Sequence, residues 1–387
     1  MPSSSSYIAV IGDFVHRGYQ HTTAPGNAAD WLTGRRGPPL KWEEPSGAVA
    51  VRGGYLERLP LALLSLGLIP QAEIWDFGWN LPQSSLPYSQ PSPRLTRRTF
   101  WLDHDVPPFR SADMLGFIEA FGPPRILCVW GLGVDETILL ACADSVKIYN
   151  SIDAPTFRIP HETSRHFDLV LTGADWQSEE VHRLYPDMAV SVLPIGPDFA
   201  DPETFRPLGS QKDYDIVYVA AAQAYKRHDI LFNAMERLPR NIRALCVIGY
   251  GEMREQFETR ARTSGLDIDF FGPPGVPFSE VNRLMNLAKI GVVCGVDDGA
   301  PAILTEYMLA GLPVLANAAL RCGLQYITPQ TGATATAADF HAGLIDLLAR
   351  APEMHPRDVV LSRWTWPHSA RRLAGLIDQC SLAKMRR

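Results

Sequence analysis

The sequence predicts an α/β protein of two domains, each a parallel β-sheet with helices on both faces. Apolar runs of strand length alternate with helical patterns almost throughout, which is typical of parallel sheets joined by helical crossovers. A chain of 387 residues is too long for one ordinary hydrophobic core. A stretch rich in Pro, Gly and Asp, residues 197–215, interrupts the alternation and indicates an inter-domain linker.

The expected elements follow the apolar pattern along the chain. In the first half the expected strands are 7–11, 72–77, 126–130, 146–152, 169–172 and 190–195, with helices at 56–66, 112–121 and 179–184. In the second half they are strands 216–220, 244–248, 268–271, 290–294 and 314–316, with helices at 229–236, 253–263, 279–287, 302–310 and 340–348. The expected domains are 1–205 and 206–362, followed by a C-terminal helix within 363–387 that crosses back to the first domain.

Composition excludes several other classes of protein. A net charge of −6 and a pI near 5.9 argue against a broad nucleic-acid surface. No apolar run reaches the roughly 18 residues of a membrane span, and the first residues lack the pattern of a signal peptide. The six cysteines form no C-x-x-C pair, as expected for reduced thiols in a cytoplasmic protein. No His/Cys cluster has the spacing of a zinc site.

The segment from Asp297 to Val314 carries the most chemical information. It joins two apolar runs, and it places Asp298 in a loop and Glu306 in the following helix. In parallel α/β domains such a loop lies at the carboxyl edge of the sheet, where ligands bind. The amides of Ala302 and Ile303 at the helix start suit a phosphate, while carboxylates suit sugar hydroxyls. Acids near helix starts are also common as caps, so this pair alone is a weak signal.

The whole string, which continues Ala310-Gly311-Leu312-Pro313-Val314, resembles the E-x7-E segment of the retaining glycosyltransferases of family 4. This resemblance implies the GT-B fold, with two Rossmann-like domains facing each other across a cleft. It implies a retaining hexosyltransferase that uses a nucleoside diphosphate sugar as co-substrate, needs no cofactor or metal, and glycosylates a small molecule or a glycan. Asp298 stands where the family usually has Glu.

Three further segments match the family's donor-binding motifs. Tyr225-Lys226-Arg227-His228-Asp229 is similar to the K-G-x-D helix start, in which the Lys reaches the diphosphate. Gly249-Tyr250-Gly251-Glu252 is similar to the G-x-G-E turn, and Phe271-Gly272 to the turn along the base. Arg52-Gly53-Gly54-Tyr55 resembles the Gly-Gly loop that approaches the donor phosphates.

One departure from the family concerns its second phosphate-binding cation. Family members usually have Arg five residues before the Lys, whereas this chain has Ala221. Arg227 is the available substitute, although neighbouring helix positions point in different directions. Either another cation compensates or the leaving diphosphate is stabilised less.

The candidate catalytic residues are Asp153, Asp135 and His104 in the first half. Trp130 stands where related enzymes often carry His or Asp, and the two acids follow predicted strands, where they can also simply cap turns. His104 lies within Asp103-His104-Asp105, which spells the D-x-D of metal-dependent transferases; the triplet recurs in the chain, and we expect no metal.

Two long inserted loops, 16–50 and 75–110, carry many aromatic residues and are expected to shape the acceptor site or to be disordered. The acceptor and the oligomeric state are not predicted. Two other classes stay open: a GT-B-fold nucleotide-sugar epimerase and a non-catalytic sugar-nucleotide-binding protein.

Overall fold

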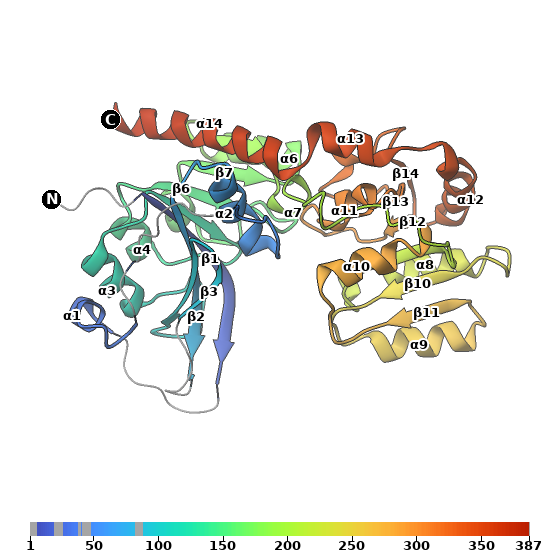
Figure 1. Cartoon of the computed structure of the whole chain (residues 1–387), viewed down its shortest axis with the longest axis horizontal. Helices are drawn as coiled ribbons and strands as arrows, with labels where there is room; N and C mark the ends of the chain where they lie inside the picture. Colours follow the sequence, from blue (N-terminus) through green and yellow to red (C-terminus); the bar gives the residue numbers. More distant parts are fainter. Residues whose placement is uncertain (1–5, 19–25, 38–39, 41–47, 82–87, 387) are drawn as a thin grey trace. The chain divides into compact units, whose positions relative to one another are not determined.

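The computed structural model describes residues 6–18, 26–37, 40, 48–81 and 88–386. The chain divides into two compact units (Figure 1): unit 1 is Met1–Ile195 with Ser369–Arg387, and unit 2 is Gly196–His368. Each unit is a Rossmann-like α/β layer structure, so the predicted fold class of two parallel-sheet domains is confirmed.

The sheet of unit 1 has the strand order β3-β4-β2-β1-β5-β6-β7-β8, and of these eight described strands only β3 runs antiparallel to its neighbour. Its strands are β1 (Tyr7–Arg17), β2 (Gln71–Trp79), β3 (Tyr88–Ser92), β4 (Leu95–Trp101), β5 (Ile126–Trp130), β6 (Val146–Asn150), β7 (Leu169–Thr172) and β8 (Ala189–Val192). Its helices are α1 (Ala28–Leu32), α2 (Tyr55–Ser65), α3 (Ala112–Phe121), α4 (Glu136–Ala141), α5 (His161–Ser164), α6 (Asp175–Leu184) and most of α14 (Trp366–Met385).

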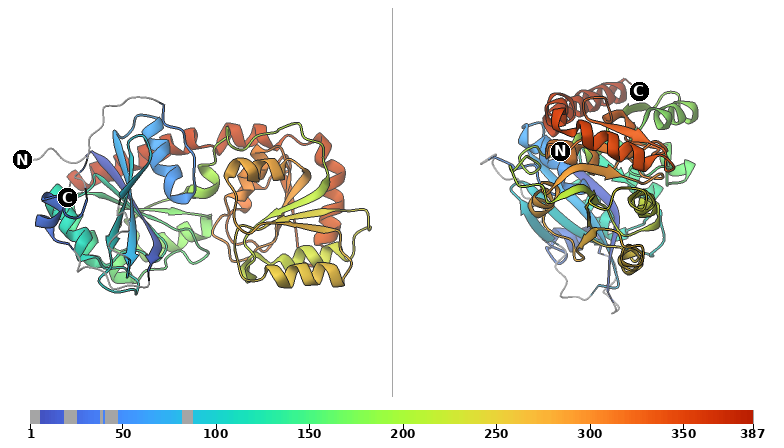
Figure 2. Two further views of the ribbon diagram at one scale, coloured as in Figure 1. Left: turned by 60° about the horizontal axis from the view of Figure 1, so that its bottom comes forward. Right: turned by 90° about the vertical axis from the view of Figure 1, so that its right-hand side faces the viewer.

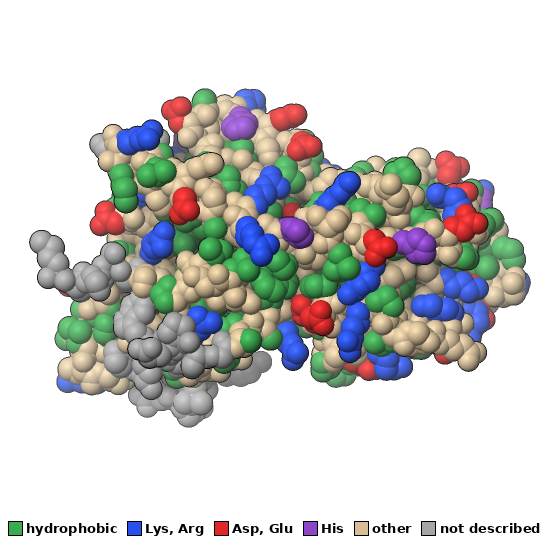
Figure 3. All heavy atoms as spheres, turned by 45° about the horizontal axis from the view of Figure 1, so that its top comes forward, with side chains coloured by type: hydrophobic (Ala, Val, Ile, Leu, Met, Phe, Trp, Pro, Cys, Tyr) green, Lys and Arg blue, Asp and Glu red, His purple; other side chains and the backbone are tan. Residues whose placement is uncertain are grey.

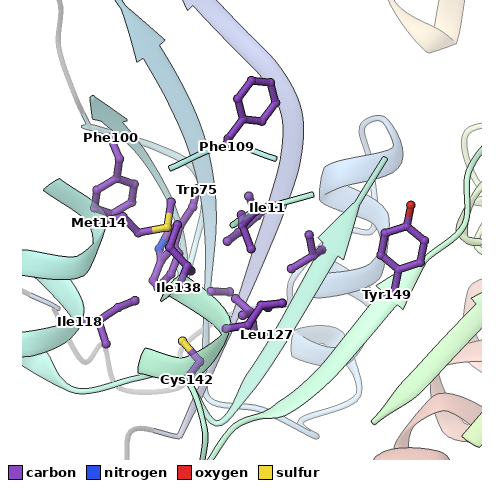
Figure 4. Close-up of a cluster of buried hydrophobic side chains, with 14 of the residues drawn as sticks. Ile11, Trp75, Phe100, Phe109, Met114, Ile118, Leu127, Ile138, Cys142 and Tyr149 are labelled. Atoms are coloured by element: carbon purple, nitrogen blue, oxygen red, sulfur yellow. The ribbon is translucent and has the colours of Figure 1, made fainter. Parts of the chain in front are cut away.

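The core of unit 1 lies between its sheet and the helices that include α3 and α4. Trp75, Phe100 and Phe117 pack edge to face, with ring centroids between 5.4 and 5.7 Å apart. Met114, Ile138 and Cys142 fill the space beside them (Figure 4). The helix α2 packs against β1 and β2 and is buried along most of its length.

The predicted loop 75–110 is wrong in part, because it contains the end of β2 and the two strands β3 and β4. The reason is a buried ion pair. Arg98 on β4 and Glu73 on β2 are both almost fully buried, 2.9 Å apart, and Trp75 donates a 2.8 Å hydrogen bond to the same carboxylate. Charged residues therefore stand inside strands, and the apolar pattern misses them. Of the predicted loop 16–50, Trp42 and its neighbours lie outside the described residues, while α1 occupies part of the remainder.

The sheet of unit 2 is wholly parallel, with the order β11-β10-β9-β12-β13-β14. Its strands are β9 (Tyr214–Val219), β10 (Ala244–Val247), β11 (Ile268–Phe271), β12 (Ala288–Val293), β13 (Val314–Asn317) and β14 (Gly332–Ala335). Its helices are α7 (Ile195–Asp198), which begins at the last residue of unit 1, α8 (His228–Met235), α9 (Arg254–Thr263), α10 (Phe278–Met285), α11 (Ile303–Leu309), α12 (Phe340–Arg350) and α13 (Pro356–Arg363), with 3-10 turns η1 (Ala224–Lys226), η2 (Leu324–Tyr326) and η3 (Ala351–Glu353).

Helices cover both faces of this second sheet (Figure 2). Alternate residues of β9 supply the two cores: Ile216 and Tyr218 pack with α8, α9 and α12, while Val217 packs with α10, α11 and α13. This alternation is the two-residue period of a strand buried on both faces.

His228, the first residue of α8, is a titratable group inside this core. Only 1% of the residue is exposed; its ring stacks on Phe257 at 4.4 Å and lies 4.6 Å from the ring of Tyr218. Neither ring nitrogen has a hydrogen-bond partner. Burial, assisted by the charge of Lys226, lowers the pKa of the imidazole from 6.5 to about 4.

The neutral His228 makes stability pH-dependent in a defined direction. Because its pKa is depressed in the folded state, its contribution is complete above the ordinary pKa of 6.5 and is lost as the pH falls towards 4. Between these values the free energy of unfolding should fall by up to about 3 kcal/mol from this group. We expect His228→Phe to remove that component in urea unfolding at a series of pH values. The exposed His182→Phe is the control, and equal pH slopes for wild type and His228→Phe would contradict the assignment.

Candidate functional site

The topological switch point of the second sheet lies between β9 and β12. The chain leaves β9 towards β10 on one side, whereas β12 is followed by β13 on the other. The two central strands pair directly, with Ile216 opposite Ile290. The loops after them therefore leave the same edge of the sheet side by side, which is the usual ligand position in such folds.

Lys226 and Asp298 come from these two loops and meet. The Nζ of Lys226 donates a hydrogen bond to Oδ2 of Asp298, and the two side chains are only 17% and 13% exposed. The same Nζ lies 4.8 Å from the ring centre of Tyr225. Tyr218 on β9 donates from its hydroxyl to the backbone carbonyl of Lys226. The backbone at Lys226 is thus anchored to β9, and its ammonium group lies next to Asp298, the first acid of the motif.

The helix α11 is held against the same two strands by Tyr307. The Val219 amide at the end of β9 donates to the Tyr307 hydroxyl at 2.6 Å. Gly291 on β12 leaves room for the ring, since a Cβ there would lie 2.5 Å from it. Sequence reasoning missed Tyr307; the glycine inside a central strand was its only signal.

The other predicted residues of this segment lie at the start of α11. Ala302 is the N-cap and Ile303 the first helical residue, while Glu306 is buried one turn inside the helix. Thr305 donates a 2.8 Å hydrogen bond to the carbonyl of Pro197 and so fixes the helix to the start of the unit. These positions share the carboxyl edge with Lys226 and Asp298.

An apolar cavity of about 200 Å³ opens at the carboxyl ends of β9, β10 and β11. It is lined by Val219, Ala220, Ala221, Val247, Ile248, Gly249, Tyr250, Phe271, Pro274, Gly275, Val276 and Val281. Gly249 and Phe271, both predicted, are therefore brought together. Gly251 closes the turn: its φ is +116°, and a Cβ would lie 2.5 Å from the backbone of Ala222. Only glycine fits at that position.

Arg227 does not stand beside Lys226 as a second cation for the same ligand. Its guanidinium makes two 2.8 Å hydrogen bonds to Asp229 on α8 and holds the pKa of that carboxyl below its usual range. Ala221, where the family has Arg, is buried in the cavity wall. Neither Arg227 nor position 221 therefore supplies a second cation beside Lys226.

In unit 1, Gly53 and Gly54 immediately precede α2. Gly53 has φ +111°, and the Gly54 amide donates to Glu57 at 2.9 Å. Arg58 donates to the Gly53 carbonyl at 3.1 Å, so the first turn of the helix fixes the loop.

The three candidate catalytic residues lie in separate loops of unit 1. Asp135 caps α4 by accepting from the Thr137 amide at 2.9 Å and from the Thr137 hydroxyl. Asp153 pairs with Arg158 at 3.1 Å, and His104 is exposed. No contact joins the three, and Asp135 has a structural role.

Each of the two D-x-D acids that flank His104 forms an ion pair with an arginine. Asp103 lies 3.3 Å from Arg110, and Asp105 accepts two 2.9 Å hydrogen bonds from Arg17. Among the described residues no group of three or more metal-ligating side chains occurs. None of the helices in the described part of the chain is long and apolar enough to cross a membrane.

Comparison with known proteins agrees with this geometry. Residues 201–353 match the family model for "Glycosyl transferases group 1". Sucrose-phosphate synthase from Thermosynechococcus elongatus is 16% identical, with a TM-score of 0.66 over 98% of this chain and 100% of that one. An α,α-trehalose 6-phosphate synthase from Burkholderia multivorans is 14% identical, with a TM-score of 0.60 over 98% and 100%. A lipopolysaccharide outer core galactosyltransferase is 13% identical, with a TM-score of 0.60 over 96% and 99%. No curated protein matches the chain in sequence.

The fold shared with these structures is GT-B, with two Rossmann-like domains. Residues 201–353, which make up most of unit 2, match the group 1 glycosyltransferase family, as the sequence motifs imply.

The contact between Lys226 and Asp298 predicts how the site responds to a free anion. Asp298 neutralises much of the lysine charge, so Asp298→Asn should strengthen the binding of inorganic pyrophosphate about fivefold, as expected for a partly buried ion pair. Isothermal titration measures this. Asp297→Asn is the matched control, because Asp297 is 67% exposed and lies 3.8 Å from Arg321. Unchanged or weaker pyrophosphate binding in Asp298→Asn would contradict the account.

Proposed function

We propose that the protein transfers a sugar from a nucleoside diphosphate sugar to an acceptor with retention of the anomeric configuration. The observation that carries this proposal is the Lys226–Asp298 contact at the β9/β12 switch point, inside the group 1 domain. A cation and a carboxylate at that edge match the two parts of a nucleotide sugar: the diphosphate and the sugar hydroxyls.

In this proposal each part of the edge binds one part of the donor. Lys226 exchanges Asp298 for the diphosphate, and the amides of Ala302 and Ile303 contact the same phosphates. Asp298, once released, and Glu306 accept hydrogen bonds from hydroxyls. The apolar cavity beside Gly249 and Phe271 receives the base.

The chemistry is electrostatic stabilisation of the leaving group. As the bond between the sugar and the diphosphate breaks, negative charge develops on the phosphate oxygen, and a positioned cation stabilises this charge more than the ground state. A phosphate oxygen of the departing donor takes the proton of the acceptor hydroxyl, so no separate base is required. This agrees with the dispersed positions of Asp135, Asp153 and His104. The face shown in Figure 3 carries interspersed acidic and basic side chains. In this proposal, substrate binding therefore depends on the local groups named above.

One observation favours a second candidate, a non-catalytic sugar-nucleotide-binding protein. The expected second cation is absent at Ala221, and Arg227 is held by Asp229. A site with one cation binds a diphosphate but stabilises its departure less.

Mixing the protein with UDP-glucose, GDP-mannose and ADP-glucose separates these proposals. We expect isothermal titration to show binding of at least one donor. We also expect slow hydrolysis of that donor, which releases its nucleoside diphosphate. Lys226→Ala should weaken binding by about tenfold or more and lower nucleotide release further, because the cation acts mainly in the transition state.

Lys289→Ala is the matched control, since Lys289 pairs with Asp215 at the opposite end of β12. Binding without release supports the non-catalytic candidate. Equal donor binding and release in wild type and Lys226→Ala would show that the site is assigned wrongly.

A further inference from the structure

The first strand of unit 1 extends beyond its neighbour at the ligand edge. β1 pairs with β5 only as far as Ile11, opposite Val129, but continues along β2 to Arg17, opposite Trp79. The register with β2 shifts between Ile11 and Val15, so extra residues bulge from β1. Strands β2 and β5 lie on opposite sides of β1, so this bulge stands at the switch point of the first sheet.

Exposed aromatic side chains lie in this bulge and at the start of the neighbouring helix α2. Phe14 is 59% exposed, and Tyr55, the first residue of α2, is 41% exposed. Tyr55 lies edge-on to Trp130 at the end of β5, with ring centroids 5.7 Å apart. A Cβ at Gly12 would lie 3.1 Å from Leu56, so the bulge and the start of α2 are in close contact. The bulge that carries Phe14 therefore lies against the start of the helix that Tyr55 begins.

A polar pair lies close to Phe14. His16 is on the part of β1 that extends beyond β5, and Asp76 is on the neighbouring strand β2. Nε2 of His16 lies 3.5 Å from Oδ2 of Asp76; the imidazole is 41% exposed and the carboxylate 3%. Nε of Arg97 lies 3.1 Å from the same oxygen, and Arg97 also donates to Glu57 at 2.8 Å. Burial raises the pKa of Asp76, while Arg97 and His16 oppose this shift. A buried carboxylate thus orients a half-exposed imidazole.

The combination fits an uncharged sugar ring. Phe14 and His16 contact each other at 4.9 Å, so an apolar ring face and a hydrogen-bonding group stand next to each other. A pyranose presents C–H groups on its face and hydroxyls at its edge, and matches both. Two acids, Asp76 and Glu57, offset Arg97 and His16, so the cluster offers little net charge for an anion.

We propose that Phe14 and His16 form an acceptor subsite for a carbohydrate, with Phe14 stacking on the sugar ring and His16 binding one hydroxyl. Asp76 acts through His16 and is a positioning residue. The reaction at this subsite rests on the proposed transfer function, but binding of a sugar there does not.

Saturation-transfer difference NMR tests the subsite directly. The probes are the methyl α-glycosides of glucose, galactose and mannose at millimolar concentration. We expect ring C–H signals from at least one glycoside with the wild type, their loss in Phe14→Ala, and their return in Phe14→Trp. His16→Ala should weaken affinity about tenfold through a lost hydrogen bond, with partial rescue by His16→Gln.

The exposed His182→Ala is the control, and thermal unfolding checks that every variant is folded. Absence of signal for all three glycosides with the wild type would overturn the proposal, as would equal signals from Phe14→Ala and wild type. Donor titration on the same samples separates the two claims. Glycoside binding without nucleotide-sugar binding defeats the transfer function alone. Nucleotide-sugar binding sensitive to Lys226→Ala, with glycoside signals indifferent to Phe14→Ala, defeats the subsite alone.

Discussion

The direct pairing of β9 with β12 is the constraint on which the proposed donor site depends. Parallel neighbours release their loops at one edge, and this alone brings together Lys226 and Asp298, which are 72 positions apart in the chain. Tyr307 then ties α11 to the end of β9, and Gly291 provides the space for its ring. Removing the strand pairing would leave the same residues without a site.

Much of the fold could be predicted because buried parallel strands are continuous apolar runs. The expected strands 126–130, 169–172 and 268–271 and the helix 112–121 have the bounds seen in β5, β7, β11 and α3. The failures have a physical cause. β4 carries Arg97 and Arg98, whose charges are matched by acids on β2 and α2 that lie distant in sequence. A local pattern contains no information about such partners.

For the candidate site, sequence could indicate the edge but not the contacts. The positions of Asp298 and Lys226 after strands predict that both lie at one edge, whereas their mutual hydrogen bond depends on loop conformation. Asp135 looked equivalent to Asp153 in sequence, and only the neighbouring Thr137 shows that it caps a helix. The overhang of β1 was hidden for a similar reason, because Asp13 to Arg17 do not form an apolar run.

In the proposals above, unit 2 binds the donor and unit 1 binds the acceptor. Unit 2 holds a cation, acids and an apolar cavity at one sheet edge, while unit 1 offers aromatic rings and an oriented imidazole at its own. In the proposed mechanism, the Ala221 at the position of the family Arg leaves the stabilisation of the leaving group to Lys226 and the helix amides. Measurements on the proposed donor site of unit 2 therefore test most directly whether the protein is a catalyst.

A crystal structure of the protein with a bound nucleoside diphosphate sugar tests the central claim most directly. The account predicts that Lys226 Nζ leaves Asp298 and lies within hydrogen-bond distance of the diphosphate, with the base in the cavity beside Gly249 and Phe271. A diphosphate bound away from Lys226, with the Lys226–Asp298 contact intact, would contradict it.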